Sequence, residues 1–330
     1  MKQKTTILMT GAGGAALPFL IASLKKHGYR VLTADMDPFA AGLFLADKGF
    51  VIPRADAQEF PAAIKKICTD ESVDIVMPLV DEELVTVSKM KGINAIPLMP
   101  RTAFIETCLD KYRLVQELEA HGIPAPKTVP ATEGPAAVGF PCIVKPRTGR
   151  GSRDVELLKN KKDFNLWKSS TGDRADRFIL QEYIDGTEYT VSVVAWRDGR
   201  VQSVVPKEII SKKGITRLAV TRRNVAIDEY CTRIQECLKA DGPFNVQLRC
   251  DKTGQPLLFE INPRYSTTVS LTILAGIDEI HGLVQQALHG PDAYQFGRFK
   301  EDVVLMRHNE DSAVTMKEFR RLQGSIEDAV

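Results

Sequence analysis

The segment from Phe244 to Arg264, FNVQLRCDKTGQPLLFEINPR, carries polar groups at the spacing of a β-hairpin. Two stretches of alternating apolar and polar residues flank the turn-rich centre DKTGQP, which is typical of a hairpin. If the turn places Cys250 opposite Leu257, Gln247 lies directly across from Glu260. The first arm therefore presents an amide to a carboxylate on the facing arm.

The second arm continues this polar face. Its alternation predicts that Phe259 and Ile261 point to one side and that Glu260, Asn262 and Arg264 point to the other. Oxygen donors at this spacing, together with the facing glutamine, suit Mg²⁺, which completes its shell with water and substrate phosphates. Arg264 would steady a phosphoryl group during transfer. A solvent-facing polar hairpin is the alternative interpretation.

A second candidate site is the loop within FPCIVKPRTGRGSRDVELL. Lys145 ends an apolar strand, and Gly149, Gly151 and Ser152 follow before the next strand. A strand–loop–strand context differs from the strand–loop–helix of a Walker A site. The physics is similar, because glycines let backbone N–H groups close over phosphate oxygens and a lysine supplies a point charge. The alternative is a plain hairpin turn with solvated side chains, including those of Arg147, Arg150 and Arg153.

The segment RFILQEYIDGTEYTV adds groups suited to a nucleoside. Glu182, Tyr183 and Ile184 end a strand, and Glu188 begins another after a turn. Free backbone groups beside apolar side chains read an adenine ring, and a nearby carboxylate accepts from ribose hydroxyls. Taken one at a time, these glutamates are better explained as surface charges, and the order of the motifs favours the nucleoside site.

The first glycine-rich segment supports a different hypothesis. GAGGAA at residues 11–16 follows a strand and opens a helix, and Asp35 ends the next strand. These are the elements of a dinucleotide-binding fingerprint, so an NAD-dependent oxidoreductase is an alternative function. Many doubly wound sheets carry such a turn only to start the helix close to the strand. The NAD hypothesis also assigns no role to the second glycine loop or to the hairpin.

The elements that must position these groups fall into two fold classes. Alternating strands and helices predict a doubly wound parallel sheet over about residues 1–100. After Pro100 come one or two helices at 102–121 and a proline-punctuated connector. Short, hairpin-linked strands follow, with helices near 161–170 and 228–240, which predicts an α+β module with largely antiparallel sheets. Two helices with glycine stops at Gly276 and Gly290, then a strand and a final helix, complete the chain.

Composition excludes several classes of protein. The 330 residues include 44 Lys and Arg against 42 Asp and Glu, so bulk charge indicates neither nucleic acid nor membrane as a partner. No apolar run approaches the roughly 18 residues of a spanning helix, and the first ten residues lead into a strand. We therefore expect a cytoplasmic protein. The six cysteines show no C-x-x-C pair and are expected to be reduced core thiols.

The succession of motifs resembles the ATP-grasp superfamily, most closely the synthetase unit of carbamoyl-phosphate synthetase large subunits and its stand-alone relatives. The motifs are Lys145 with its glycine loop, then QEYI and Glu188, then Gln247 and the EINPR segment. The resemblance covers about residues 5–290 and includes a pre-ATP-grasp domain. It implies three parts: a Rossmann-like domain at 1–100, a small subdomain at 101–186 and a large subdomain at 187–330.

The resemblance also implies roles for individual residues. ATP would be held by Lys111, Lys145, Gly149, Gly151, Ser152, Glu182, Tyr183, Ile184 and Glu188. Two Mg²⁺ ions, with Mn²⁺ as a substitute, would be held by Gln247, Glu260 and Asn262, with the carboxylate bridging. Glutamine at position 247, where many members have an acidic residue, favours the carbamoyl-phosphate synthetase branch.

The implied activity is an ATP-dependent ligase that activates a carboxylate as an acyl phosphate for capture by an amine or thiol. The cationic run at 207–224 contributes Lys207, Arg217 and Arg222 as candidates for substrate carboxylate or phosphate, with a solvated loop as the alternative. A carboxyphosphate- or carbamate-forming kinase unit is the second candidate within the class, and a regulatory nucleotide-binding protein is a third. The expected partners are small-molecule substrates and, in a homodimer, a second copy of the chain.

Overall fold

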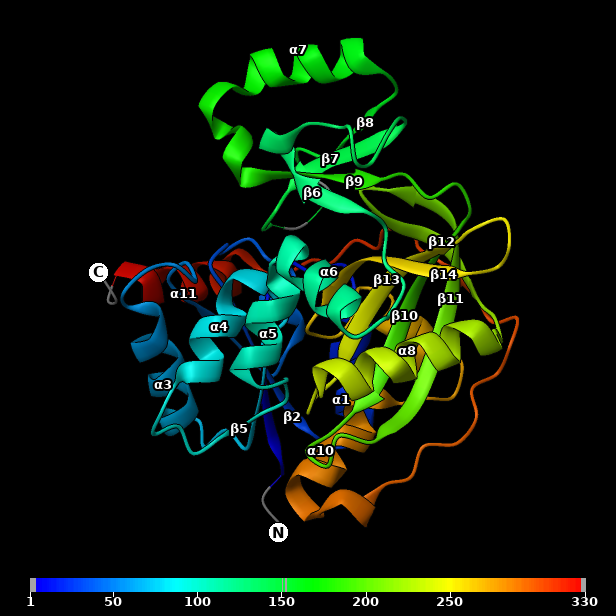
Figure 1. The fold of residues 1–330 in the computed structure, drawn as a ribbon. Coiled ribbons are helices and arrows are strands. Elements are labelled where there is room, and N and C mark those ends of the chain that lie inside the picture. Colours follow the sequence, from blue (N-terminus) through cyan, green and yellow to red (C-terminus); the bar gives the residue numbers. More distant parts are fainter. Residues whose placement is uncertain (1–3, 150, 152, 328–330) are drawn as a thin grey trace.

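The computed structural model describes residues 4–149, 151 and 153–327 (Figure 1). The first domain is a parallel sheet with strand order β3-β2-β1-β4-β5. Its strands are β1 (Thr6–Thr10), β2 (Arg30–Asp35), β3 (Lys48–Val51), β4 (Ile75–Met77) and β5 (Ile96–Pro97). Its helices are α1 (Leu17–Lys26), α2 (Gly42–Leu45), α3 (Phe60–Asp70) and α4 (Asp81–Lys89). The predicted doubly wound sheet is confirmed. The short elements α2 and β3 were not predicted, because four residues are too few to show a period.

The second sheet is small and antiparallel, with strand order β6-β9-β7-β8. Its strands are β6 (Thr128–Pro130), β7 (Cys142–Pro146), β8 (Glu156–Leu158) and β9 (Phe178–Glu182). Helix α7 (Lys161–Thr171) packs on it through Phe164 and Trp167, and 3-10 turns at Ala131–Glu133 and Gly172–Arg177 complete the layer. Figure 1 shows this unit projecting from one end of the molecule.

The third sheet is antiparallel, with strand order β14-β13-β10-β11-β12-β15. Its strands are β10 (Thr187–Ala195), β11 (Val201–Lys213), β12 (Ile215–Thr221), β13 (Phe244–Cys250), β14 (Pro256–Asn262) and β15 (Val304–Met306). The helices that accompany it are α8 (Val225–Leu238), α9 (Val269–Leu274) and α10 (Glu279–His289), with a 3-10 turn at Pro291–Ala293. The antiparallel module expected from the sequence is therefore present.

Helices α5 (Thr102–Leu109) and α6 (Lys111–Ala120) pack on the large sheet and not on the small one. The rings of Phe104 and Phe244 meet edge to face, with centroids 5.2 Å apart. Leu114 and Leu118 of α6 join the same buried cluster. The subdomain boundaries at 101–186 and 187–330 stay a prediction, and this packing favours a small subdomain that begins after α6.

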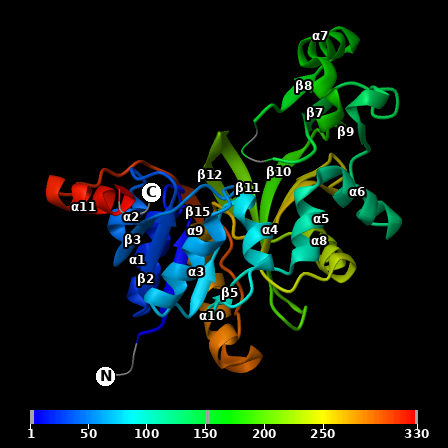
Figure 2. The same cartoon turned by 90° about the vertical axis from the view of Figure 1, so that its left-hand side faces the viewer.

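The chain returns to the first domain at its end. In Figure 2 the last helix, α11 (Met316–Glu327), lies beside α2 and β3. Its Phe319 ring lies 5.7 Å from the ring of Phe39 and 5.8 Å from that of Phe44. The tail is therefore anchored on the domain that the chain builds first.

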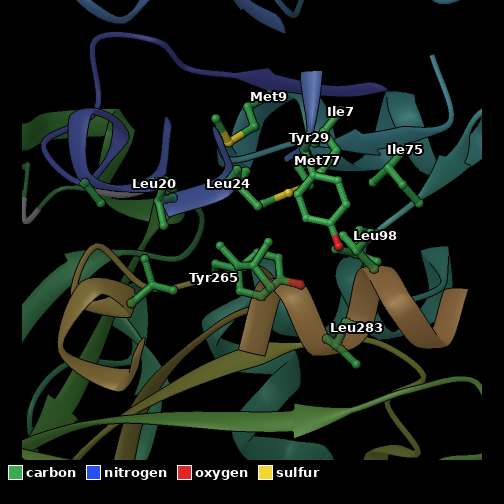
Figure 3. Close-up of a cluster of buried hydrophobic side chains, with 14 of the residues drawn as sticks. Ile7, Met9, Leu20, Leu24, Tyr29, Ile75, Met77, Leu98, Tyr265 and Leu283 are labelled. Atoms are coloured by element: carbon green, nitrogen blue, oxygen red, sulfur yellow. The ribbon is translucent and has the colours of Figure 1, made fainter. Parts of the chain in front are cut away.

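A buried cluster joins the first domain to the large sheet and its helices (Figure 3). Met9 and Leu20 come from the parallel sheet and its first helix, whereas Tyr265 and Leu283 come from the loop after β14 and from α10. Burial of apolar side chains on this scale fixes the two units against each other. The loop that follows β14 is thus held in a defined position over the first domain.

The hairpin β13–β14 has the predicted central pair but a different turn. Gln247 faces Glu260, as expected, although Cys250 pairs with Pro256 and not with Leu257. A bulge next to the Gln247–Glu260 pair restores the register. One extra residue in a strand reverses the facing of side chains beyond it.

The bulge corrects the predicted faces of the second arm. Leu258 and Ile261 are the two residues buried in the core, and Phe259 is only half-buried. Phe259 and Glu260 instead line the same cavity. The prediction that Phe259 shares a face with Ile261 is therefore wrong, since the bulge places the phenyl ring beside the carboxylate.

Two composition-based expectations can be compared with the structure. Each of the six cysteines carries a free thiol, and all but the half-buried Cys237 are buried. Within the part of the chain that the structure describes, no helix has both the length and the apolarity needed to cross a membrane.

Candidate active site

One cavity between the small and large sheets collects most of the residues singled out from the sequence. Among its described lining are Lys111, Lys145, Gly149, Glu182, Tyr183, Ile184, Glu188, Gln247 and Glu260. These residues come from separate segments between positions 111 and 260. The motifs that are separate along the chain therefore come together at one place in the fold. We call this space the first cavity.

Lys145 is the buried cation of the first cavity. Its Nζ donates to Oε1 of Gln181 and to the backbone carbonyl of Phe259, each at 2.8 Å. Burial lowers the pKa of Lys145 to about 7, although the charge of Glu260 acts in the opposite direction. The lysine thus links the small sheet to the bulge of the large one. An incoming anion would favour its charged form.

Lys111 begins α6 and reaches across the same cavity. Its Nζ donates to the carbonyl of Gly149 at 2.7 Å and lies 3.4 Å from Oε1 of Glu260. The preceding residue, Asp110, caps the helix and also accepts two bonds from Arg147, from Nε at 2.8 Å and from Nη2 at 2.7 Å. The base of the glycine loop is therefore tied to the start of α6.

The glycine loop itself has backbone conformations that favour glycine. Gly149 has φ +123° and Gly151 has φ +72°. A side chain at the first of these positions would be strained whatever the space around it. Arg153 also lines the first cavity. Ser152 and Arg150, which the sequence analysis included in this loop, lie outside the described residues.

The predicted adenine-reading segment follows the end of β9. The ladder between β7 and β9 ends at Glu182, so the backbone of Tyr183 and Ile184 continues past the paired region and lines the first cavity. The Glu182 carboxylate accepts from the backbone N–H of Lys127 at 3.2 Å. This arrangement suits the recognition of a flat heterocycle by backbone groups, and adenine binding here stays a prediction.

Glu188 is held between two cations that the sequence analysis did not assign. Lys212 Nζ lies 3.1 Å from one of its carboxylate oxygens, and Arg249 Nη2 lies 3.1 Å from the other. The Arg249 guanidinium also lies over the ring of Tyr183, 5.5 Å from its centroid. Nothing in the sequence separates Lys212 from its cationic neighbours. Only the path of the long hairpin β11–β12 brings it over the cavity.

The oxygen-rich face of the hairpin has two cross-strand pairs, Gln247 with Glu260 and Asn245 with Asn262. Alternation places Asn245 on the same face as Gln247, although the sequence analysis gave it no role, and its Oδ1 accepts from Thr190 at 2.8 Å. Among the described residues no cluster of three His, Cys, Asp or Glu side chains could bind a metal. One carboxylate with neutral amide oxygens nevertheless fits Mg²⁺, which uses few protein carboxylates and takes its remaining ligands from water and phosphate.

Two further cavities continue from the first. The second cavity shares Glu188, Lys212, Gln247 and Glu260 with the first, and Asn262 and Arg264 also line it. The third cavity lies over the carboxyl ends of the first domain's strands, and it shares Arg264, Ser266 and Thr267 with the second. The three cavities are therefore neighbours, with the hairpin carboxylate on the border of the first two and Arg264 on the border of the last two.

Arg264 stands where the second and third cavities meet. Its Nη2 donates to Oδ2 of Asp81 at 3.1 Å, Nε donates to the other oxygen of that carboxylate, and Nη1 donates to the carbonyl of Tyr265 at 3.1 Å. Nη2 also lies 3.4 Å from Oδ1 of Asn262. Asp81 begins α4 of the first domain, and no sequence signal connects it to a hairpin 183 residues away.

The structure does not bring Lys207 to any of these cavities. Its side chain is fully buried, and its Nζ donates to Ser192 at 2.7 Å and to Thr272 at 2.8 Å. Burial lowers the pKa of Lys207, and the charge of the buried Glu279 opposes this shift. The predicted contact with substrate does not fit this geometry, because the ammonium is enclosed in a structural network.

Arg217 and Arg222 are also turned away from the described linings. Arg217 is exposed on β12, and its neighbour Thr216 is the residue that lines the second cavity. Arg222 pairs with Glu208 at 2.9 Å and with Asp302. Because successive side chains of a strand point to opposite faces, the side chain next to one that lines the cavity points away from it. The cationic run thus supplies Lys212 to the site, and the catalytic assignment of Arg217 lacks a supporting contact.

The parallel first domain and the cavity between two antiparallel sheets define the class of protein. Residues 174–310 match the family model described as ATP-grasp in the biosynthetic pathway with Ter operon. Residues 7–95 match the model described as PylC-like, N-terminal domain. The chain therefore carries an ATP-grasp domain preceded by a PylC-like N-terminal domain. The predicted family is confirmed.

Curated relatives are distant. The uncharacterized protein y4rH of Sinorhizobium fredii is 25% identical over 280 residues, which cover 77% of this chain and 52% of that protein. The chain thus spans about half the length of this relative. The formate-dependent phosphoribosylglycinamide formyltransferase of Bacteroides thetaiotaomicron is 23% identical over 297 residues, covering 83% of this chain and 74% of the relative.

Solved structures share the fold. The L-amino acid ligase from Bacillus licheniformis has a TM-score of 0.69 at 19% identity, covering 88% of this chain and 75% of that one. N5-carboxyaminoimidazole synthetase from Staphylococcus aureus has a TM-score of 0.73 at 17% identity, covering 99% and 87%. The particular likeness to the carbamoyl-phosphate synthetase branch stays a prediction.

Proposed function

We propose that this protein is an ATP-dependent ligase that activates a carboxylate as an acyl phosphate, which an amine or thiol then captures. The observation that carries the proposal is that neighbouring cavities share the residues suited to phosphoryl transfer. Glu260 and Gln247 line both the first and second, and Arg264 lines both the second and third. A nucleotide in the first cavity would direct its terminal phosphate toward a substrate in the third.

The reaction has two steps. A carboxylate oxygen attacks the γ-phosphorus of ATP, and the bond to the bridging oxygen breaks, so that ADP leaves with its electron pair. The nucleophile then attacks the carbonyl carbon of the acyl phosphate, inorganic phosphate leaves, and the nucleophile loses its proton. No covalent bond to the protein is required. The chain's role is to position the reactants and to stabilise charge.

Buried cations would hold the polyphosphate. Lys145 and Lys111 line the first cavity from two sides, and the carbonyl of Gly149 is already tied to the second lysine. We infer that the glycine loop closes over the phosphates. Closure would exclude water and protect the acyl phosphate from hydrolysis. Arg264, held between two cavities, would face the phosphoryl group as it is transferred.

The hairpin fits the metal that this chemistry uses. Glu260, Gln247 and Asn262 would hold two Mg²⁺ ions, or Mn²⁺ in their place. When bound, such ions neutralise negative charge on the phosphoryl oxygens. The chain's own contribution is a face of oxygen donors set by two cross-strand pairs. Lys111, 3.4 Å from the carboxylate, would help to balance the charge of the metal-free site.

The alternatives are less well supported. A carboxyphosphate- or carbamate-forming kinase unit would use the same nucleotide site and differs only in the acceptor. An NAD-dependent oxidoreductase would need the first glycine turn, yet the Gly13 N–H is already bonded to Asp35 at 2.9 Å. The cytoplasmic location and the homodimer expected from the sequence remain predictions.

Nucleotide-dependent stabilisation and ADP release test the proposal. We expect ATP with Mg²⁺ to raise the melting temperature, because a ligand that binds only the folded form stabilises it, and NAD(H) to leave it unchanged. Glu260→Gln should abolish ADP release while the protein stays folded. The matched control is Glu156→Gln, at an exposed position on β8 outside the described linings. Stabilisation by NAD alone, or full turnover in the Glu260 variant, would refute the assignment.

A further inference from the structure

The third cavity is mostly apolar. It lies where the strands of the first domain end, and its walls include Leu17, Leu20, Ile52, Phe60 and Val269. Only three acidic or basic side chains belong to its described lining, namely Asp35, Glu83 and Arg264. A ligand that fits this space needs an apolar body. It should also carry few negative groups, because the lining offers little positive charge to hold them.

The one cation of this lining is already paired. Arg264 donates from Nε and Nη2 to the two oxygens of Asp81, and both side chains are nearly buried, at 13% and 10% exposure. A bidentate arginine–carboxylate pair of this kind satisfies most of the charge of the guanidinium. Apart from this paired arginine, a phosphate group inside the cavity would meet no cation among the lining residues that the structure describes.

The glycine turn offers little to an anion. In dinucleotide-binding folds, backbone N–H groups of such a turn hold a phosphate. Here the N–H of Gly13 donates to Asp35 Oδ2, that of Gly14 to the carbonyl of Gly11, and that of Leu17 to the carbonyl of Gly14, each at 2.9 Å. A carboxylate thus occupies the place where a phosphate would bind. Two anions there would repel each other.

Asp35 is instead suited to a cationic ligand. Its Oδ2 accepts from Gly13 and its Oδ1 accepts from the N–H of Asp37 at 3.0 Å, so the carboxylate is held in one orientation at the cavity wall. Each carboxylate oxygen has a second lone pair that can accept from an ammonium group. The other carboxylate, Glu83, is turned to the backbone, where it accepts from Leu79 and Val80 at 2.9 Å.

We propose that the third cavity binds a substrate that is not phosphorylated, in which an apolar body carries a free ammonium group held by Asp35, as in an apolar amino acid. The inference deepens the proposed function and rests on it, because Arg264 lines both this cavity and the second cavity, where transfer is proposed. It separates this chain from relatives whose names specify a phosphoribosyl substrate. The difference in expected substrate follows from the charge of the cavity lining and not from the fold.

A panel of defined probes tests the inference in the full chain with MgATP. Leucine, methionine and phenylalanine, alone and in pairs, are compared with their N-acetyl forms and with phosphoribosylglycinamide, which is supplied together with formate as the carboxylate. We expect ADP release with the free amino acids only. ADP release with phosphoribosylglycinamide and formate but with none of the free amino acids would overturn the inference. In that case the nucleotide site would stand, whereas failure of MgATP to bind would refute the proposed function itself.

Variants at the cavity wall sharpen the test. Asp35→Asn should raise the KM for the amine substrate roughly tenfold or more, the scale of a lost charged hydrogen bond, with the KM for ATP unchanged. Asp37→Asn is the matched control, since this exposed neighbour accepts from Phe39 in the same loop and does not belong to the described lining. Equal KM values in the two variants would contradict the role of Asp35.

A variant at an exposed position tests the same idea without disturbing the fold. Met36 lines the third cavity and is 54% exposed, so Met36→Lys adds a cation without burying it. We expect weaker binding of free amino acids and a gain of binding by phosphoribosylglycinamide, both measured by thermal shift. Unchanged preference in this variant would show that charge at the cavity wall does not select the substrate.

Discussion

Arg264, two residues beyond the hairpin strand β14, is held by Asp81, the first residue of α4 in the first domain. Arg264 Nη2 lies 3.1 Å from Oδ2 of Asp81. The pair connects segments 183 residues apart in sequence. Asp81 is 8% exposed and lies outside the described linings of the three cavities, whereas Arg264 lines two of them. The carboxylate therefore positions the arginine without touching the reacting groups.

Replacing this carboxylate should impair turnover more than nucleotide binding. In Asp81→Asn the guanidinium would lose its bidentate partner and its orientation toward the phosphoryl group. We expect ADP release to fall roughly 100-fold, the scale seen when one group that stabilises the transition state is removed. The calorimetric affinity for ATP should change little. Asp70→Asn, at an exposed position on α3, is the control, and equal turnover in the two variants would contradict the positioning role.

ATP binding should take up a proton through Lys145. Burial lowers the pKa of this lysine to about 7, so at pH 8 most of its amines are neutral. Phosphate anions favour the charged form and raise the pKa on binding, so proton uptake should be greatest above pH 7 and vanish below it. Calorimetry at pH 8 in two buffers of different ionisation enthalpy measures this uptake. Lys145→Met should abolish it, whereas Lys162→Met, exposed on α7, should retain it.

A substitution in the glycine loop should affect ATP and not the fold. Gly149 has φ +123°, so Gly149→Ala strains the loop by about 1–3 kcal/mol. We expect the KM for ATP to rise roughly tenfold or more if that strain opposes closure of the loop. Gly139→Ala is the control, because Gly139 has φ +70° in an exposed turn outside the described linings. Similar ATP kinetics in both variants would show that the loop does not hold the nucleotide.

Lys207 should prove to be a structural residue. Lys207→Met would leave the buried Glu279 without its neighbouring positive charge, at a cost of about 3–5 kcal/mol in the free energy of unfolding. The double variant Lys207→Met with Glu279→Leu should recover most of that loss, since it removes both charges. Urea denaturation measures both effects. A folded double variant that releases no ADP would restore the catalytic hypothesis for Lys207.

Much of the hairpin could be predicted from alternation alone. The pairing of Gln247 with Glu260 depends on local periodicity, and the structure confirms it. The predicted turn register is one residue off, and the bulge offsets that difference. The bulge could not be predicted from the sequence, because it depends on tertiary contacts. It buries Leu258 and Ile261 and turns the Phe259 carbonyl toward Lys145.

The sequence by itself determined the classes of element and the order of the motifs, because periodicity, glycines and capping residues act over a few neighbours along the chain. Only the tertiary structure decided which polar groups face one another. It enclosed Lys207 in the core, brought Lys212 and Arg249 to Glu188, and joined Asp81 to Arg264. Such contacts link segments far apart in the chain, and their pairing follows from the packing of sheets and not from local spacing.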